Sequence, residues 1–346
     1  MGPHPAVAEV RLGVRRSLAG LAPGDLVLAA CSGGADSLAL AAALAFEAPR
    51  IGLRGGGVTV DHGLQAGSAE QALRVTAVLA ALGLSPVLSV RVCPSGPGGP
   101  EAAARAARYR ALDDAAGRLG AVAVLLGHTL DDQAETVLLG LARGSGARSL
   151  AGMPARQGRY LRPLLTVRRA QTTAACAAQR LEPWDDPHNR DPAYARARVR
   201  HQALPALADA LGPGIAEALA RTACLLRADA DVLDALAEAE SMRLRDGEGA
   251  FDADGLAGLP AAIRTRVLHA AATAAGCPAG GLTARHVAGL DALVTDWHGQ
   301  RWADLPGGVR GLRRYGRLIF TAGPGAPEPG SAENNAENAE GAGGRG

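Results

Sequence analysis

The sequence predicts an α/β fold, in which a parallel-sheet domain is followed by a smaller, mainly helical C-terminal domain. Its length of 346 residues is about twice that of an ordinary domain. Through the first half, short apolar runs alternate with helix-period patterns, as is typical of parallel strands joined by helices. From about residue 214 onward, the apolar residues mainly follow the helical period.

Four pairs of a strand and a helix account for the first half. The expected strands cover 25–31, 56–60, 85–90 and 121–127, and the helices that follow them cover 37–48, 67–83, 100–119 and 129–143. Because a helix follows each strand, the strands should pair in parallel with helices on both faces of the sheet.

A domain boundary is expected at Gly212-Pro213. Segment 182–194, EPWDDPHNRDPAY, is too rich in Pro, Asp and Asn for regular structure, and the helix expected after it ends at this Gly-Pro pair. The predicted domains are therefore 1–212 and 213–322. Residues 323–346 carry no large apolar side chain, so we expect a disordered tail.

The second domain should begin with a long amphipathic helix over 214–246, followed by shorter helices near 256–275 and 283–296. The apolar positions expected to form the core face of the long helix are Ile215, Leu219, Leu226, Leu233 and Leu236. The last stretch, QRWADLPGGVRGLRRYGRLIF, has a PGG turn between two β-like runs. We therefore expect a small sheet at the end of this domain.

Composition excludes several classes of protein. No stretch approaches the roughly 18 apolar residues of a membrane span, and the N-terminus lacks a signal-peptide core, so a cytoplasmic location is expected. The five cysteines stand singly without a CxxC pair, which argues against disulfide frameworks, zinc sites and iron–sulfur clusters. All 36 basic residues are arginine, which excludes any chemistry that needs a lysine of the protein.

Positive charge is concentrated in the middle of the chain. The net charge is only +2, but residues 141–200 carry 12 arginines against 4 acidic residues. A second group of arginines lies near the C-terminal end, at Arg310, Arg313, Arg314 and Arg317. Such groups are typical of phosphate-binding surfaces, and we expect Arg313 and Arg314 to contact a nucleic acid. The whole chain has only 3 Trp, 4 Tyr and 3 Phe, so phosphate contacts rather than a broad stacking surface are expected.

The loop after the first strand has the features of a phosphate site. Two glycines allow the backbone to approach an anion closely, and the helix that follows directs free N–H groups at it. A carboxylate here would repel phosphate unless a divalent cation joined the two, so Asp36 is a candidate Mg²⁺ ligand. The candidate nucleotide-binding residues are Ser32, Gly33, Gly34, Ala35, Asp36 and Ser37.

A second polar segment follows the fourth expected strand. His128, Asp132 and Glu135 are spaced at i, i+4 and i+7, which places them on one helix face. Thr129 with Asp132 also fits a capping box, but capping needs only one carboxylate. The carboxyl edge of a parallel sheet is where ligands bind, so we interpret these side chains as functional.

These motifs resemble known ones. SGGADS at 32–37 resembles the PP-loop of enzymes that cleave ATP between its α and β phosphates, a fold also called adenine nucleotide alpha hydrolase-like. LDDQAET at 130–136 resembles the signature of the tRNA(Ile)-lysidine synthetase family. Further segments agree with that family: VDHGLQ, EAAARAARYRAL, RPLL, DPHNRDPAYARARVR and LPGGVRGLRRYGRLIF. Three positions depart from its usual pattern, without touching the phosphate loop: Cys31, Asp61 and Gln65.

The resemblance implies an enzyme that uses ATP and Mg²⁺ to join free L-lysine to the wobble cytidine of a CAU-anticodon tRNA(Ile). The cytidine would be adenylated first, and the product, lysidine, would read AUA in place of AUG. The resemblance assigns adenylation and lysine placement to Asp36, Arg108, His128, Asp132 and Glu135. Contacts with lysine or tRNA would come from Arg105, Asp131, Arg198 and Arg200. A homodimer is also considered.

Three other classes of protein share part of this pattern. A tRNA thiolation enzyme shares the PP-loop but usually needs paired cysteines, which are absent here. An ammonia-using synthetase has no need of the arginine-rich segment 141–200 or of an added helical domain. A non-catalytic tRNA-binding protein would not need Asp36, Asp132 and Glu135.

Overall fold

The computed structural model describes residues 2–61, 63, 67–93, 100–144, 146–186, 191–278 and 280–322, the first three residues of 100–144 by backbone alone. Residue contacts divide the chain into two compact units, Met1–Arg227 and Ala228–Gly346. The division falls within the long helix α10, Ile215–Leu244. The boundary expected at residue 212 stays a prediction, and the expected tail lies outside the described residues.

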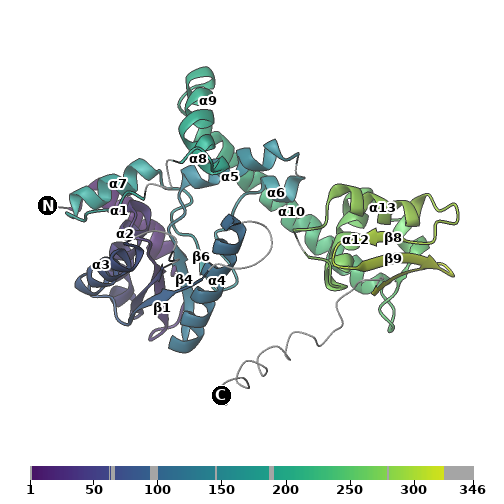
Figure 1. Cartoon of the computed structure of the whole chain (residues 1–346), viewed down its shortest axis with the longest axis horizontal. Coiled ribbons are helices and arrows are strands. Elements are labelled where there is room, and N and C mark those ends of the chain that lie inside the picture. The colour runs from purple at the N-terminus through teal and green to yellow at the C-terminus, as the bar shows by residue number, and fades with distance from the viewer. Residues whose placement is uncertain are drawn as a thin grey trace, which may run out of the picture. The chain divides into compact units, whose positions relative to one another are not determined.

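The first unit contains the expected parallel sheet (Figure 1). Its strand order is β3-β2-β1-β4-β6-β5, and only the pair β5 and β6 is antiparallel. The four main strands fall where the apolar runs predicted them, which confirms the α/β class. The strands are β1 Leu26–Ala30, β2 Arg54–Asp61, β3 Val87–Arg91, β4 Ala121–Leu126, β5 Arg156–Gln157 and β6 Tyr160–Leu161.

Helices cover both faces of this sheet. One face packs against α1 Pro5–Ser17, α2 Ala35–Glu47, α3 Ser68–Ala81 and α7 Arg169–Ala178, and the other against α4 Pro100–Leu119. Sequence patterns did not predict α1, α7 or the short β5–β6 pair. The remaining elements of the unit are a 3-10 turn Ala48–Ile51, α5 Leu130–Ala142, α6 Ala147–Leu150, α8 Ala195–Arg198, a π-helical turn Val199–Ala203 and α9 Leu204–Leu211.

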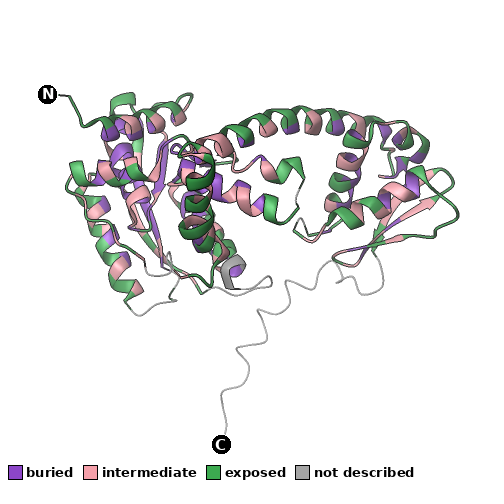
Figure 2. Cartoon of the chain, turned by 90° about the horizontal axis from the view of Figure 1, so that it is seen from above, coloured by how far each residue is buried: buried purple, intermediate pink, exposed green. Residues whose placement is uncertain are grey.

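Strand β1 is buried on both sides (Figure 2). Val27 and Ala29 belong to the core shared with α1 and α2, whereas Leu26 and Leu28 belong to the core shared with α4. Alternate side chains of a strand point to opposite faces, so a strand covered on both faces must be apolar throughout. The unbroken apolar run LVLAA follows directly from this position.

The strand order creates the place where a ligand can bind. From β1 the chain winds outward to β2 and β3, and it then returns to the other side of β1 as β4. Ala30 at the end of β1 lies opposite Leu126 at the end of β4. The loops that leave these two strands therefore start side by side, and open α/β sheets bind ligands at such switch points.

The second unit is a mixed helical and β unit, so the expectation of a mainly helical domain is partly wrong. Its antiparallel sheet has the order β7-β10-β9-β8. The expected C-terminal sheet is present, but it gains a two-residue strand, too short to show a strand period in the sequence. Its elements after α10 are β7 Phe251–Asp252, α11 Ala253–Ala257, α12 Ala261–Ala274, α13 Ala284–Thr295, β8 Ala303–Leu305, β9 Val309–Arg314 and β10 Arg317–Ala322.

Helix α10 buries every seventh residue, mostly alanine: Ala216, Ala223, Ala230, Ala237 and Leu244. The expected core positions Ile215, Leu219 and Leu226 are partly buried, and Leu233 is partly buried against the core of the second unit. Leu236 is 51% exposed, so the expectation is wrong at this position.

In the part of the chain that the structure describes, no helix is long and apolar enough to cross a membrane.

Gly56 in β2 provides a test of sheet packing. A Cβ atom at Gly56 would lie 2.7 Å from Leu28 Cδ2 and 2.8 Å from the carbonyl oxygen of Pro86. We expect Gly56→Ala to lower the free energy of unfolding by roughly 1–3 kcal/mol, because a backbone carbonyl cannot move aside cheaply. Gly117→Ala is the matched control, since Gly117 is helical with nothing within 4 Å of its added Cβ. Chemical denaturation should show that this control gains stability, and equal losses in both variants would contradict the packing argument.

Candidate active site

The loop between β1 and α2 has the geometry of a phosphate cradle. Gly33 has a φ of +89°, which side chains rarely adopt, and an added Cβ would lie 2.8 Å from Gln71 Nε2. Gly34 is the N-cap residue of α2, and no described side chain caps the N-terminus of this helix. Ser37 ties the loop together, because its Oγ accepts from the Ser32 N–H at 3.1 Å and donates to the Gly34 carbonyl at 2.9 Å. The free N–H groups of the first turn, which begins at Ala35, suit a phosphate.

One arginine, Arg169 at the start of α7, joins this loop to α5. Its Nε lies 3.4 Å from Asp36 Oδ2, and its Nη2 donates to Asp132 Oδ1 at 2.8 Å. Its Nη1 lies 3.4 Å from Glu135 Oε1. The second oxygen of Asp36 accepts from the hydroxyl of Thr172, one turn further along α7. Three carboxylates, from the N-terminal parts of two helices far apart in the sequence, α2 and α5, therefore meet around one guanidinium.

Glu135 is completely buried and held by further arginines. Arg200 Nε donates to its Oε1 at 2.7 Å, and Arg200 Nη2 donates to its Oε2 at 3.1 Å. Arg196 Nε lies 3.3 Å from Oε2. Burying a carboxylate is costly without such partners, so Arg196 and Arg200 supply the positive charge and hydrogen bonds that this buried side chain needs.

Asp132 has two functions in the structure. Its Oδ2 accepts from the Thr129 N–H at 2.8 Å and so caps α5. Its Oδ1 faces the guanidinium groups of Arg169 and Arg200, at 2.8 and 3.1 Å. The capping and the functional interpretation of this residue are therefore compatible, because they use different oxygens.

Burial and ion pairing shift the pKa values of the carboxylates in opposite directions. Burial raises the pKa of Asp36, and the Thr172 hydroxyl and Arg169 offset only part of that rise. Burial also acts to raise the pKa of Asp132, but Arg169, the Thr129 N–H and other positive neighbours outweigh it and lower the pKa. For Arg169, burial opposes the charge while Asp132, Glu135 and Asp36 prevail and raise the pKa. The guanidinium therefore stays charged at every physiological pH.

His128 is neutral at physiological pH. Burial lowers the pKa of His128 to about 4, against a partial opposing effect of Asp132, and Arg162, Arg196 and Arg105 lower it further. Its Nδ1 is buried and makes no hydrogen bond to any described residue. A neutral imidazole with an unused nitrogen is available to a ligand as a hydrogen-bonding group rather than as a charge.

A cavity of about 210 Å³ adjoins the carboxylates. One wall is charged and the other is apolar, the latter built by α9 and the start of α10. The charged wall consists of Asp131, Glu135, Arg168, Arg169 and Arg200, and the apolar wall includes Leu204, Pro205, Ala208, Pro213 and Ile215. A ligand that fits it should combine an alkyl chain with charged ends.

The structure brings five of the predicted site residues to one place, namely Asp36, Asp131, Asp132, Glu135 and Arg200. Asp131 accepts from the backbone N–H of Arg169 at 2.7 Å. Arg198 is not among them, because its Nη1 bonds the carbonyl oxygens of Pro192 and Ala193. The assigned functions of all these side chains stay predictions.

Two arginines predicted at the site lie on the exposed face of α4. Arg105 lies over the ring of Tyr109 at 5.0 Å, and Arg108 is exposed. The positive charge of Arg105 still reaches His128 and lowers its pKa. Of the positions that depart from the family pattern, Cys31 is buried and Asp61 accepts from the Gly63 N–H at 2.9 Å. Gln65 lies outside the described residues.

Sequence patterns did not single out Arg169, Thr172 or Arg196. One signal could have found Arg169: two consecutive arginines, Arg168 and Arg169, begin α7, where the helix dipole disfavours positive charge. Such a pair at a helix N-terminus requires acidic neighbours from elsewhere in the fold. Trp184 was also not predicted. Its backbone N–H donates to the Gly33 carbonyl at 2.9 Å, which places segment 181–186 beside the loop.

Fold and site define the chain as a PP-loop protein. Residues 14–207 match the family model of the PP-loop domain. The solved structure of the U34-tRNA thiolase NcsA from Methanococcus maripaludis with its [4Fe-4S] cluster is similar, with a TM-score of 0.54 and 19% identity. The alignment covers 64% of this chain and 80% of that one, and at this identity it shows the fold alone. In the described part of this chain, no three His, Cys, Asp or Glu side chains are placed to hold a metal ion by themselves.

The chain belongs to the tRNA(Ile)-lysidine synthase family. It is 63% identical to the tRNA(Ile)-lysidine synthase of Thermobifida fusca, over 93% of this chain and 99% of that protein. It is 55% identical to the one of Streptomyces coelicolor, over 93% of this chain and 100% of that protein. Residues 251–319 also match the model of the TilS substrate binding domain. The resemblance that the motifs predicted is confirmed.

The low pKa of His128 predicts a measurable pH dependence. The folded-state pKa of about 4 lies below the ordinary value of 6.5, so protonation favours the unfolded chain. The contribution to stability is complete above pH 6.5 and is lost as the pH falls toward 4. We expect wild type to lose up to about 3 kcal/mol more than His128→Asn over this range, measured by denaturant unfolding at each pH. Parallel pH profiles of the two proteins would contradict the buried, neutral state of His128.

Proposed function

We propose that the chain ligates free L-lysine to carbon 2 of the wobble cytidine of CAU-anticodon tRNA(Ile), with ATP converted to AMP and pyrophosphate. Family membership supports the reaction. One structural observation carries its placement: Asp36 of the phosphate loop, Asp132 and Glu135 surround a single cation, the Arg169 guanidinium. Carboxylates grouped in this way suit a place where ATP with its Mg²⁺ and a cationic amine would bind next to each other.

The phosphate loop would hold the triphosphate of ATP. The first turn of α2 supplies N–H groups, Gly33 and Gly34 allow close approach, and Ser32 and Ser37 line the loop. Asp36 fits a Mg²⁺ ligand, but it brings only one carboxylate, so phosphate oxygens would have to complete the shell. Mg²⁺ bound there would neutralise charge that develops on the departing pyrophosphate.

The first step would convert the oxygen on carbon 2 of the cytosine from a poor leaving group into a good one. The oxygen on carbon 2 of the cytosine attacks the α-phosphorus of ATP, and the bond to pyrophosphate breaks. His128, neutral and with an unused Nδ1, could then donate or accept a hydrogen bond with the base or a phosphate without adding charge. Arg105 and Arg108 on α4 are proposed to assist this step.

The second step would use the two-sided cavity. The alkyl chain of lysine would lie against the apolar wall of Leu204, Ala208 and Ile215. The carboxylate of Glu135 in the charged wall, with that of Asp132 nearby across Arg169, would attract its ammonium group. The ε-nitrogen must lose a proton before it attacks carbon 2, and the bond from that carbon to the AMP oxygen then breaks. Asp132 and Glu135 are the proposed acceptors of that proton, in an order that we leave open.

The tRNA would lie over the arginine-rich segment 141–200, which adjoins the site, and over part of the second unit. Arg198, exposed beside the site, and Arg314 are proposed to contact its phosphates. A cytoplasmic location, where tRNA is modified, and a homodimer belong to the same proposal.

Asp36 is the residue with which to test the ATP step. We expect Asp36→Asn to reduce pyrophosphate release by at least roughly a hundredfold, because the Mg²⁺ ligand is lost while the side chain keeps its size. The assay uses the full chain, tRNA(Ile) transcript and radiolabelled ATP. Thr172→Val is a useful companion, because it removes the hydroxyl bonded to Asp36 but leaves the carboxylate. Pyrophosphate release near the wild-type rate in Asp36→Asn would contradict the assignment.

A substitution at Glu135 tests the lysine step separately from the ATP step. We expect Glu135→Gln to raise the lysine KM by roughly tenfold or more and to leave the ATP KM within about twofold, because only the charge facing the cavity is removed. Glu47→Gln is the matched control: Glu47 is equally buried and pairs with Arg15 at 2.8 Å, on the far end of α2. The control should lose stability without a change in lysine KM. A rise in ATP KM equal to that of lysine would place Glu135 in the metal shell instead.

A further inference from the structure

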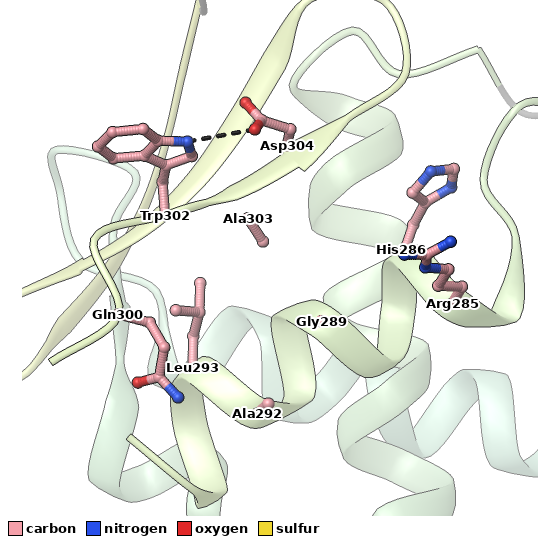
Figure 3. Close-up of a pocket in the computed structure, with 9 residues that line it drawn as sticks. All are labelled: Arg285, His286, Gly289, Ala292, Leu293, Gln300, Trp302, Ala303 and Asp304. Carbon is pink, nitrogen blue, oxygen red and sulfur yellow. Dashed lines mark hydrogen bonds between the residues drawn. The ribbon is translucent and has the colours of Figure 1, made fainter. Parts of the chain in front are cut away.

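The second unit has a cavity of its own, of about 350 Å³, between α13 and β8. Figure 3 shows Trp302, Gln300 and Leu293 at one end of it and Arg285 and His286 at the other, with Ala303 and Gly289 between them. This volume is at the lower end of the range for small-molecule sites. The cavity therefore suits one flat, nucleotide-sized group rather than a helix or a duplex.

Exposed aromatic side chains gather at this end of the sheet. Trp297 is 48% exposed, Trp302 43% and Tyr315 98%. Ala303 of β8 pairs with Gly311, and Arg314 of β9 pairs with Arg317, so the segment before β8 and the turn after β9 lie at the same end. A chain with only 3 Trp, 4 Tyr and 3 Phe thus places three of them, exposed, on one small surface.

The two-residue hairpin loop between β9 and β10 requires a positive φ at position 315, but packing does not require a tyrosine there. The φ of Tyr315 is +47°, in the left-handed region that favours glycine, and Gly316 follows with a φ of +77°. Large side chains are rare in this conformation because it costs stability, and a ring that is 98% exposed gains almost nothing from packing. A contact with another molecule would explain why a tyrosine stands at this exposed turn.

Two arginines next to these rings in the sequence, Arg301 and Arg314, make no ion pair with a described residue. Most arginines in the described part of the second unit pair with an acid: Arg243, Arg264, Arg266, Arg310, Arg313 and Arg317. Arg245 and Arg285 also make no ion pair with a described residue, but Arg245 stacks on Phe251, and Arg285 lies at the opposite end of the cavity from Trp302.

Arg313 is less available than its sequence position predicted. It donates to the Val294 carbonyl at 3.0 Å, pairs with Asp254 at 3.0 Å and is 16% exposed. Its guanidinium also lies 5.3 Å from the centre of the Trp297 ring. Arg313 therefore supports the surface from below, whereas Arg314 beside it is free to contact phosphate.

We propose that this surface, the aromatic end, binds single-stranded RNA and takes one unstacked base into the cavity beside Trp302. The aromatic end is defined as Trp297, Trp302 and Tyr315 with Arg301 and Arg314. The proposal rests on the proposed function, because tRNA is the RNA that this chain would meet. Base faces are hidden in a duplex but open in a single strand, so exposed rings beside free arginines favour the single strand.

Trp302 is held ready for stacking. Its Nε1 donates to Asp304 Oδ2 at 3.2 Å, and the Arg310 guanidinium lies 4.6 Å from the ring centre. Arg310 in turn pairs with Asp304 at 2.7 Å. These contacts fix the ring, so a base that stacks on its exposed part orders little else. Both polar atoms of the Gln300 amide are bonded within the segment, to His298 and Asp296, and hold the wall of the cavity beside Trp302. At the opposite end, His286 is bonded through its Nδ1 to Thr283, which leaves its Nε2 available to a ligand.

Binding of a short RNA by the full chain tests the proposal. The probe is a fluorescein-labelled, unstructured RNA of about six nucleotides, compared by anisotropy with an RNA duplex of about twice that length. We expect Trp302→Ala to weaken binding of the single strand by roughly tenfold and Trp302→Phe by no more than about threefold, since a phenyl ring still stacks. Duplex binding should change by less than about twofold in both variants.

Two further variants keep the test decisive if Trp302→Ala unfolds the unit. Tyr315→Ala lies at an exposed turn and should weaken single-strand binding severalfold while the melting temperature stays constant. Met242→Ala, on α10, removes a side chain that is 69% exposed and should change neither. Wild-type affinity in folded Trp302→Ala and Tyr315→Ala, or equal losses for single strand and duplex, would overturn the proposal.

Failure of this inference can be told apart from failure of the proposed function. If wild type forms lysidine and the aromatic-end variants keep the wild-type tRNA KM, the inference fails and the function stands. If wild type forms no lysidine, the oligonucleotide experiment still decides whether the aromatic end binds single-stranded RNA.

Discussion

The candidate site depends on one balance of charge, the contact of the Arg169 guanidinium with Asp36, Asp132 and Glu135. Three carboxylates this close repel one another, and burial disfavours their charge. Arg169, Arg196 and Arg200 lie among them and supply positive charge that opposes both effects. A cationic substrate or metal ion that enters would meet a site whose carboxylates are already placed, and it would compete with an internal cation for them.

The fold supplies the positions that this balance needs. Parallel strands β1 and β4 end side by side, so the loop with Asp36 and the helix start with Asp132 meet although almost a hundred residues separate them. Helix α7 then enters with its N-terminus toward both, which is an unfavourable place for arginine in isolation. The attraction of Asp36, Asp132 and Glu135 for Arg169 offsets that cost. Asp131 also accepts a hydrogen bond from the backbone N–H of Arg169. Capping, packing and charge therefore hold the same few residues, and a change in one contact should disturb the others.

Because the chain contains no lysine, arginine supplies the basic side chains of both the candidate site and the aromatic end. Guanidinium groups do not lose their proton at physiological pH, and their planar shape lets one side chain contact several carboxylates, as Arg169 and Arg200 do. The same planarity lets Arg310 and Arg313 lie near the rings of Trp302 and Trp297. The chain is proposed to bind free lysine, yet all of its own strongly basic side chains are arginine. Guanidinium groups stack on rings and form forked hydrogen bonds, which an ammonium group does not do.

The sequence by itself determined the class of fold, the phosphate loop and the carboxylates of α5, because each depends on residues that are neighbours along the chain. Strand and helix periods, two glycines before a helix, and acids spaced at i and i+3 are local patterns. Only the tertiary structure decided that Arg169 and Thr172 face Asp36, that Arg200 rather than Arg198 reaches Glu135, and that α10 buries alanines in place of Leu236. It also decided that three of ten scattered aromatic residues share one end of a sheet. These features depend on pairing between distant segments, and no local period records which face of a helix or which end of a strand another segment will cover.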